Sequence, residues 1–143
     1  MDTTRKTETF TQPVGAGLVD PRGFVVPVTA TLGYDPTDPF AVTANFATEV
    51  TEVSWTFARD LLTFGLLEPS GDGDVHVWPC LDDQGRAVVM VELTSDQGEA
   101  LMQMSTTDVA SFVERMLETV PTGEESDHLD LDGLVDALLA ADA

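Results

Sequence analysis

Apolar and polar residues alternate with a period of two along two neighbouring stretches in the middle of the chain. Such alternation is typical of a strand with one buried face, and it predicts strands over Phe40–Thr48 and Val53–Phe57. Only the short link Thr48–Thr51 separates them, so we expect an antiparallel pair. The apolar positions are Phe40, Val42, Ala44 and Phe46 in the first strand and Val53, Trp55 and Phe57 in the second.

Prolines indicate that the N-terminal strands lie at the margin of a sheet. Within the polar and glycine-rich residues 1–22, Thr7–Val14 is predicted to be an edge strand because Pro13 has no N–H to donate to a central ladder. Gly23–Leu32 is rich in β-branched residues and contains Pro27, which also indicates an edge or a bulge. Residues 1–22 are therefore expected to form an edge strand or a less ordered segment.

A second group of strands follows the turn-forming cluster Pro69–Asp74. Asp74–Pro79 and Arg86–Thr94 are joined by Leu81–Gly85, whose composition predicts a hairpin. Gly98–Ser105 alternates in hydrophobicity, but its residues also tolerate a helix. We favour a third strand there.

A short helix is predicted to follow the strand Val53–Phe57 directly, over Ala58–Phe64, with Gly65 as its C-terminal stop. Arg59 and Asp60 form a charged pair at this corner. The apolar side chains expected in the core here are Trp55, Phe57, Leu61 and Leu62.

The clearest helical pattern follows Ser105. Ser105 and Asp108 resemble a capping box in which Asp replaces Glu, and Pro121 is expected to end the helix. The apolar stripe repeats at intervals of three and four residues over Val109, Phe112, Val113, Met116, Leu117 and Val120.

The last helix is predicted over residues 130–141, with Asp130 as its N-cap. Its apolar stripe must be covered, and we expect the core of the same chain to cover it; the alternative is a neighbouring subunit or another partner. The elements together predict one α+β domain over residues 1–143, with antiparallel sheets and packed helices. The stripe consists of Leu131, Leu134, Val135, Leu138 and Leu139.

The charge balance excludes some partners. Six Lys and Arg stand against twenty-six Asp and Glu, a formal net charge of −20, which opposes binding to nucleic acid and to anionic membranes. The one cysteine, Cys80, cannot form an intramolecular disulfide, which fits a cytoplasmic setting. No apolar run approaches the roughly 20 residues of a transmembrane segment, so none is expected.

No stretch carries a convincing catalytic, cofactor or metal motif. Gly15–Gly17 begins like a dinucleotide fingerprint, but Asp20 stands where the third glycine belongs. His76 and Cys80 lie four residues apart on one strand face, roughly 13 Å, which is too far for a catalytic pair. We therefore assign no catalytic, cofactor-binding or metal residue and expect no enzyme.

Five motifs in a fixed order give the chain a specific resemblance. It is similar to the SsgA-like proteins of sporulating actinomycetes over roughly residues 24–140. The motifs are D-P-F-A-V at 38–42, V-S-W-T-F-A-R-D-L-L-T-F-G-L at 53–66, G-D-G-D-V-H-V-W-P at 71–79, G-E-A-L-M at 98–102 and V-P-T-G-E at 120–124.

The resemblance implies a non-enzymatic cytoplasmic adaptor that recruits the tubulin-like protein FtsZ, or promotes its assembly, at future sporulation septa. FtsZ contact could be direct or pass through another SsgA-like protein. The implied fold is Whirly-like, with about six to eight strands, and the implied assembly is a homo-oligomer, a trimer.

The matched motifs also suggest candidate contacts with a partner: Arg59, Asp60 and Gly123. Each has a structural alternative, a corner salt bridge for the charged pair and an ordinary turn for the glycine.

The resemblance also implies an alternative function, because Whirly relatives can bind single-stranded nucleic acid. Trp55, Phe57 and Trp78 could stack bases, but stacking sites need surrounding basic residues, which are scarce here. Core packing is the better account of these aromatics.

Overall fold

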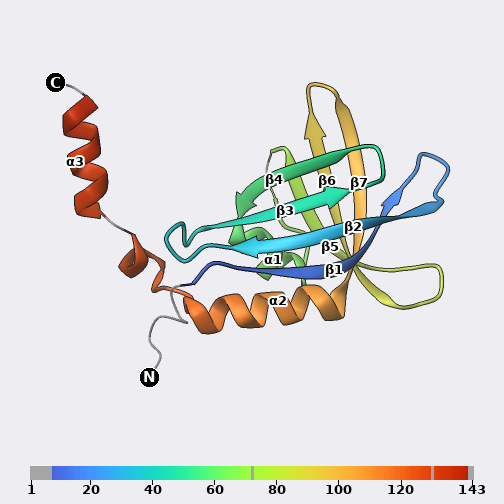
Figure 1. Cartoon of the computed structure of the whole chain (residues 1–143). Coiled ribbons are helices and arrows are strands. Elements are labelled where there is room, and N and C mark those ends of the chain that lie inside the picture. Colours follow the sequence, from blue (N-terminus) through green and yellow to red (C-terminus); the bar gives the residue numbers. More distant parts are fainter. Residues whose placement is uncertain (1–7, 72, 130, 142–143) are drawn as a thin grey trace.

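Alternating apolar residues build seven strands, which pair in one antiparallel sheet in the order β4-β3-β2-β1-β7-β6-β5 (Figure 1). This computed structural model describes residues 8–71, 73–129 and 131–141. The elements are β1 (Phe10–Val19), β2 (Val25–Tyr34), β3 (Ala41–Ala47), β4 (Glu52–Ala58), α1 (Arg59–Gly65), β5 (Val75–Leu81), β6 (Ala87–Ser95), β7 (Gly98–Ser105), α2 (Thr106–Thr119), the 3-10 helix η2 (Glu125–His128) and α3 (Leu131–Ala141).

This architecture confirms the predicted α+β class, with a single sheet in place of several. All the predicted hairpins are present, and Gly98–Ser105 is a strand. The sheet consists of two meanders, β1 to β4 and β5 to β7. Within the sheet, they are joined where Ala16–Val19 of β1 pairs with Leu101–Met104 of β7.

The core lies on one face of the curled sheet, and α2 covers that face. Strand residues two apart point to the same side, and the apolar stripe of α2 packs against them. The fully buried side chains include Leu32, Val42, Val77, Val89, Val91, Met104, Val109, Phe112 and Met116.

The predicted edge position of the N-terminal strand is wrong, because β1 lies between β2 and β7. The prolines misled the prediction for a local reason. Pro13 pairs with Thr31 of β2, but the pairing with β7 begins only at Ala16, so the other side of Pro13 carries no ladder. Pro27 likewise lies beyond the part of β2 that pairs with β3. Both prolines lie where their strands extend past a neighbouring strand. One side of each proline therefore has no ladder partner, as at the edge of a sheet.

The helix α2 begins with half of the predicted capping box. The Ser105 hydroxyl accepts a hydrogen bond from the Asp108 backbone N–H at 3.2 Å, as expected. The Asp108 carboxylate does not return the bond to Ser105, and instead accepts the backbone N–H of Gly15 at 2.8 Å. The Asp108 side chain therefore ties the start of α2 to β1. The helix ends at Thr119, before Pro121, as predicted.

The short helix α1 follows β4 without a loop, as predicted, and Gly65 is its last residue. The reason for glycine is close packing: a Cβ at this position would lie 2.3 Å from Cγ1 of Val77 on β5. Of the side chains predicted in the core, Phe57 and Leu62 are buried, whereas Trp55 and Leu61 pack against the core while half-buried.

The last helix, α3, stands away from the sheet, beyond the C-terminal end of α2 (Figure 1). Val135, Leu138 and Leu139 are 51%, 60% and 63% exposed. For these three positions of the stripe, the expectation that the chain's own core covers them is therefore wrong. The predicted cap Asp130, and the residues Thr7 and Asp72 of two other predicted segments, lie outside the described residues.

Candidate partner-contact site

Arg59 is the first residue of α1, and its position is set by the turn from β4 into the helix. Its backbone N–H donates to the Phe40 carbonyl at 2.8 Å, and its own carbonyl accepts the Thr63 hydroxyl at 3.3 Å. These two hydrogen bonds fix the backbone of Arg59. Its side chain points inward, and the residue is only 1% exposed.

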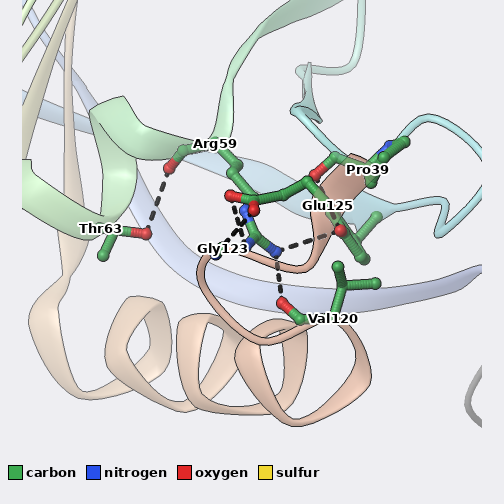
Figure 2. Close-up of polar contacts among 7 residues, drawn as sticks. Pro39, Arg59, Thr63, Val120, Gly123 and Glu125 are labelled. Atoms are coloured by element: carbon green, nitrogen blue, oxygen red, sulfur yellow. Dashed lines mark hydrogen bonds and ion pairs between the residues drawn. The ribbon is translucent and has the colours of Figure 1, made fainter. Parts of the chain in front are cut away.

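The buried guanidinium joins three segments that are distant in the sequence (Figure 2). One terminal nitrogen donates to the Tyr34 hydroxyl at 3.1 Å and to the Val120 carbonyl at 2.8 Å. The other lies 3.1 Å from the Glu125 carboxylate, an ion pair without hydrogen-bond alignment. Arg59 thus connects α1 to the end of β2, the end of α2 and η2. Arginine suits this task because its planar fork offers several fixed donors.

The Val120 carbonyl is a natural acceptor, since it lies at the C-terminal end of α2, where carbonyls have no partner within the helix. A cation is favourable beside such carbonyls because the helix dipole makes this end negative. Arg59 therefore completes the C-terminus of α2 from outside the helix.

Glu125 links the ion pair to the turn that follows α2. Its carboxylate accepts the backbone N–H of Gly123 at 2.8 Å, while its other oxygen faces Arg59. Gly123 has φ +90°, in the left-handed region, and a Cβ there would meet nothing within 4 Å. Glycine is favoured at this position by its backbone conformation alone.

The titration of the cluster follows from these contacts. Hydrogen bonds from the Glu125 backbone N–H and from Gly123, with the Arg59 charge, hold the pKa of the Glu125 carboxyl below its ordinary value, although burial opposes the shift. Burial raises the pKa of the Tyr34 hydroxyl above its ordinary value, and Arg59 offsets part of this rise. The ionised carboxylate and the neutral phenol are therefore the forms this site stabilises.

The structure separates the three residues that the sequence grouped as contacts. Asp60 and Gly123 are exposed, but the surface position expected for Arg59 is wrong. Its ion pair is with Glu125 across the fold and does not involve its neighbour Asp60. Asp60 lies in the first turn of α1, where its negative charge interacts favourably with the positive end of the helix dipole.

Sequence reasoning missed Tyr34, Val120 and Glu125 as partners of Arg59. A signal existed, because Arg59 lies in the matched motif at 53–66 and Val120 begins the matched motif at 120–124, and both motifs carried the family resemblance. The hydrogen bond from Arg59 to Val120 shows that these two motifs meet in space. Their separation of 61 residues kept any local pattern from revealing it. This cluster holds α1, the end of α2 and η2 together. Among the described residues, it places no nucleophile beside a general base.

The fold is that of an α+β protein with one curled sheet, and its sequence matches the family described as "Streptomyces sporulation and cell division protein, SsgA" over residues 28–125. The chain belongs to this family of sporulation and cell division proteins. It is 45% identical over 126 residues to the sporulation-specific cell division protein SsgB of Frankia casuarinae, covering 87% of each chain. It is 47% identical over 116 residues to SsgB of Streptomyces coelicolor, covering 80% of this chain and 84% of the relative.

Solved structures agree with the sequence comparison. An SsgA-like sporulation-specific cell division protein from Thermobifida fusca superimposes with a TM-score of 0.81 at 35% identity, over 92% of this chain and 96% of that one. An SsgB structure from work on mutations that correlate with longitudinal cell division in Streptomyces coelicolor gives 0.80 at 41% identity, over 85% and 95%. These relatives act in sporulation cell division. In the described part of this chain, no helix is long and apolar enough to cross a membrane.

Proposed function

We propose that this chain is a non-enzymatic adaptor of sporulation cell division that recruits FtsZ, or promotes its assembly, at future septum sites. The observation that carries the proposal is its 45% identity to a sporulation-specific cell division protein across most of both chains. A scaffold role also fits a site built to hold a surface in place rather than to perform chemistry.

The contact surface is an exposed face of α1 with the adjoining turn, which we call the α1 face: Asp60, Phe64, Leu67 and Gly123. Phe64 follows Asp60 by four residues, so both lie on one side of the helix. Phe64 is 52% exposed and Leu67 is 84% exposed. FtsZ is expected to be acidic like this chain, so an apolar contact with few charges suits the pair better than broad electrostatic attraction.

Arg59 supports this face from below as a positioning residue. Through Glu125 and Val120 it holds the turn that carries Gly123 beside the start of α1. We therefore assign Asp60 and Gly123 to direct contact and Arg59 to the geometry that presents them.

Co-sedimentation with FtsZ and GTP tests the proposal. The wild-type chain should pellet with the polymer or raise its mass, and Phe64→Asp should lose this effect. The matched control is Val50→Asp, since Val50 is 92% exposed in the distant β3–β4 turn. A wild-type chain that neither pellets nor changes polymer mass contradicts direct contact, and the contact would then need a bridging SsgA-like protein.

We further propose that the chain works in the cytoplasm at division septa, as a homo-oligomer, a trimer. A fluorescent fusion in the sporulating native host should form a ladder of bands before FtsZ does. Diffuse fluorescence throughout sporulation contradicts recruitment by this chain.

The alternative, binding of single-stranded nucleic acid, gains no support from the described surface. The exposed arginines there are Arg22, Arg86 and Arg115, of which the first two lie at hairpin tips and the third on α2. Trp55 is half-buried against the core. A gel-shift series at about 50 mM salt, where phosphate contacts are strong, should show no complex.

A further inference from the structure

The strand β4 forms one edge of the sheet, and one side of its backbone is not covered by another strand of the described chain. In the strand order, β3 is its one neighbour. The antiparallel pairing with β3 runs without a bulge, from Ala41 opposite Ala58 to Ala47 opposite Glu52. A regular edge of this kind presents a row of backbone groups to which a further strand can pair.

Hydrogen bonds at the two ends of this ladder show which backbone groups of β4 are free. The Arg59 N–H donates to the Phe40 carbonyl, and the Thr48 N–H donates to the Thr51 carbonyl, each at 2.8 Å. Hydrogen-bonded pairs alternate along an antiparallel ladder, so the odd-numbered residues of β4 bond to β3. The even-numbered residues direct their N–H and C=O groups away from the sheet. These exposed residues are Glu52, Ser54 and Thr56.

The opposite edge of the sheet, β5, is closed by the chain itself. Val77 exchanges two backbone hydrogen bonds with Ser70, each at 2.8 Å. Pro79 follows on the same side of β5 and has no N–H to donate. Such devices keep an edge from pairing with another chain. Because β4 contains neither a proline nor a bulge, it is the edge that accepts a further strand.

The core-side face of β4 borders an open apolar pocket, which we call the β4 pocket. Val53, 43% exposed, and the half-buried Trp55 line it from β4. The β6–β7 hairpin, which lies behind β4 in Figure 1, contributes Leu93, Ala100 and Met102. Its volume of about 220 Å³ suits a few side chains, since pockets for small-molecule ligands usually hold about 300–1,000 Å³. A strand added beside β4 would direct every second side chain towards this pocket.

The exposed charges around this edge are negative. Glu52 begins β4, and Glu49 lies in the turn before it. On the β6–β7 hairpin, Asp96 is exposed at the turn and Glu99 lines the β4 pocket. None of the described arginines lies on β4, β6 or β7. The carboxylates therefore favour a partner segment that carries lysine or arginine.

We propose that β4 is a docking edge for an extended, basic segment of a partner protein. The segment pairs with the free backbone groups of Glu52, Ser54 and Thr56 and places alternate apolar side chains in the β4 pocket. Main-chain hydrogen bonds supply affinity in this mode of recognition, and the pocket and the carboxylates supply selectivity. The docking edge is separate from the proposed α1 face, because it uses a different element and a different kind of contact.

A second copy of this chain is a poorer occupant of the edge. Two β4 strands would pair about a twofold axis, which joins two copies and does not close the proposed trimer. Each copy also has a formal net charge of −20, so two copies repel one another. A charged residue such as Glu52 discourages pairing between like edges, whereas it attracts a basic segment.

Fluorescence anisotropy with a designed peptide tests the docking edge. The labelled probe alternates valine with threonine and has a lysine at each end, so that its threonines lie opposite Ser54 and Thr56 and its valines face the β4 pocket. Saturable binding to the wild-type chain is expected. A peptide with proline for threonine lacks the N–H donors, and a peptide with glutamate for lysine reverses the charge. Each should bind roughly tenfold more weakly or worse. Equal binding of all three peptides, or no binding of the first, overturns the proposal.

Substitutions at Thr56 show whether the peptide pairs with the backbone of β4. Thr56→Pro removes a free N–H and leaves the ladder with β3 intact, and it should weaken peptide binding by roughly tenfold or more. Thr56→Ala keeps the N–H and should bind like the wild type. Circular dichroism should show both variants folded, and the peptide series decides the question if Thr56→Pro does not fold. Equal binding by the two folded variants contradicts backbone pairing.

Charge variants test the preference for a basic segment. Glu99→Gln should weaken binding of the lysine peptide by a few-fold, as expected for an exposed charge pair. Glu114→Gln, at an exposed position of α2, is the matched control and should leave binding unchanged. Equal weakening by both variants would show that overall charge, and not the carboxylate at the β4 pocket, attracts the peptide, which contradicts the proposed selectivity.

Solution mass separates a partner segment from a second copy. The mass of the wild-type chain should be the same as that of Thr56→Pro and of Thr56→Ala. A fall in mass with Thr56→Pro alone would mean that β4 pairs with another copy, and it would overturn the proposed partner. FtsZ co-sedimentation with Phe64→Asp reports on the α1 face independently.

Discussion

The helices α2 and α3 have the same kind of sequence pattern, but the apolar side of α2 is buried and that of α3 is exposed. Both repeat apolar residues at three- and four-residue intervals. In α2 the stripe is buried, with Val109, Phe112 and Met116 fully covered, whereas Leu138 and Leu139 of α3 are more than half exposed. An amphipathic pattern therefore shows that a helix needs a covering surface, but not which molecule provides it.

The difference has an energetic origin. Burying a large apolar side chain contributes about 1.5–3 kcal/mol, so the α2 stripe adds substantially to the stability of a single chain. The α3 stripe gains this contribution only on association. An isolated helix of 11 residues is marginal in water, so α3 should be most stable when it is docked.

Removing an apolar side chain from each helix should expose this contrast most strongly. Phe112→Ala should lower the free energy of unfolding by about 3–5 kcal/mol, because Phe112 is fully buried and contacts the Phe10 ring at 5.5 Å between centroids. Leu138→Ala should change it by less than about 0.5 kcal/mol in dilute, monomeric protein. Urea denaturation followed by circular dichroism measures both.

Comparable losses from the two substitutions in dilute protein would show that α3 packs on its own chain in solution. The stripe of α3 would then be covered within one chain, as that of α2 is.

The second largest effect is expected at Arg59, where α2 ends and the chain turns towards α3. Arg59→Ala removes one partner of a buried ion pair. It leaves the Val120 carbonyl without this donor and the Glu125 carboxylate without its counter-charge. A loss of about 3 kcal/mol is expected, at the lower end for such pairs because Glu125 retains Gly123 and some solvent contact. Thermal unfolding measures this loss. Arg59→Lys keeps the charge without the planar fork and should lose less; if it loses as much, the fork rather than the charge stabilises this junction.

Sequence reasoning succeeded where the structure depends on local information and failed where it depends on contacts between distant parts of the chain. Period and turn chemistry are local, and they correctly predicted the Val75–Leu81 strand, its hairpin and the end of α2 before Pro121. The location of β1 depends on its pairing with β7, about 85 residues away, which no local pattern encodes.

The predicted surface position of Arg59 was wrong for a related reason. A charged pair at a corner suggests a solvated surface, and Asp60 fits this expectation. Arg59 is buried because Val120 and Glu125 reach it from the other end of the core, and only the folded chain reveals such partners. Burial of an arginine is predictable only together with its acceptors.

A smaller effect is expected at the start of α2. Ser105→Ala removes the hydroxyl that accepts the Asp108 N–H, which should lower the free energy of unfolding by about 1 kcal/mol. Ser111→Ala is a suitable control, since Ser111 is an exposed interior position of the same helix and alanine is slightly favoured there. Equal effects in the two variants would mean that the Ser105 cap does not stabilise the start of α2.

The smallest predicted effect is a pH dependence of stability that comes from Glu125 at the junction between α2 and η2. The pKa of Glu125 is lowered in the folded chain from the ordinary 4.5, so its contribution to stability is complete above that value and is lost as the pH falls through the folded pKa. Glu125→Gln should therefore flatten the dependence of unfolding free energy on pH below about 4.5. If Glu125→Gln keeps the full wild-type dependence, other carboxylates carry it, and the ion pair with Arg59 serves geometry without contributing to acid sensitivity.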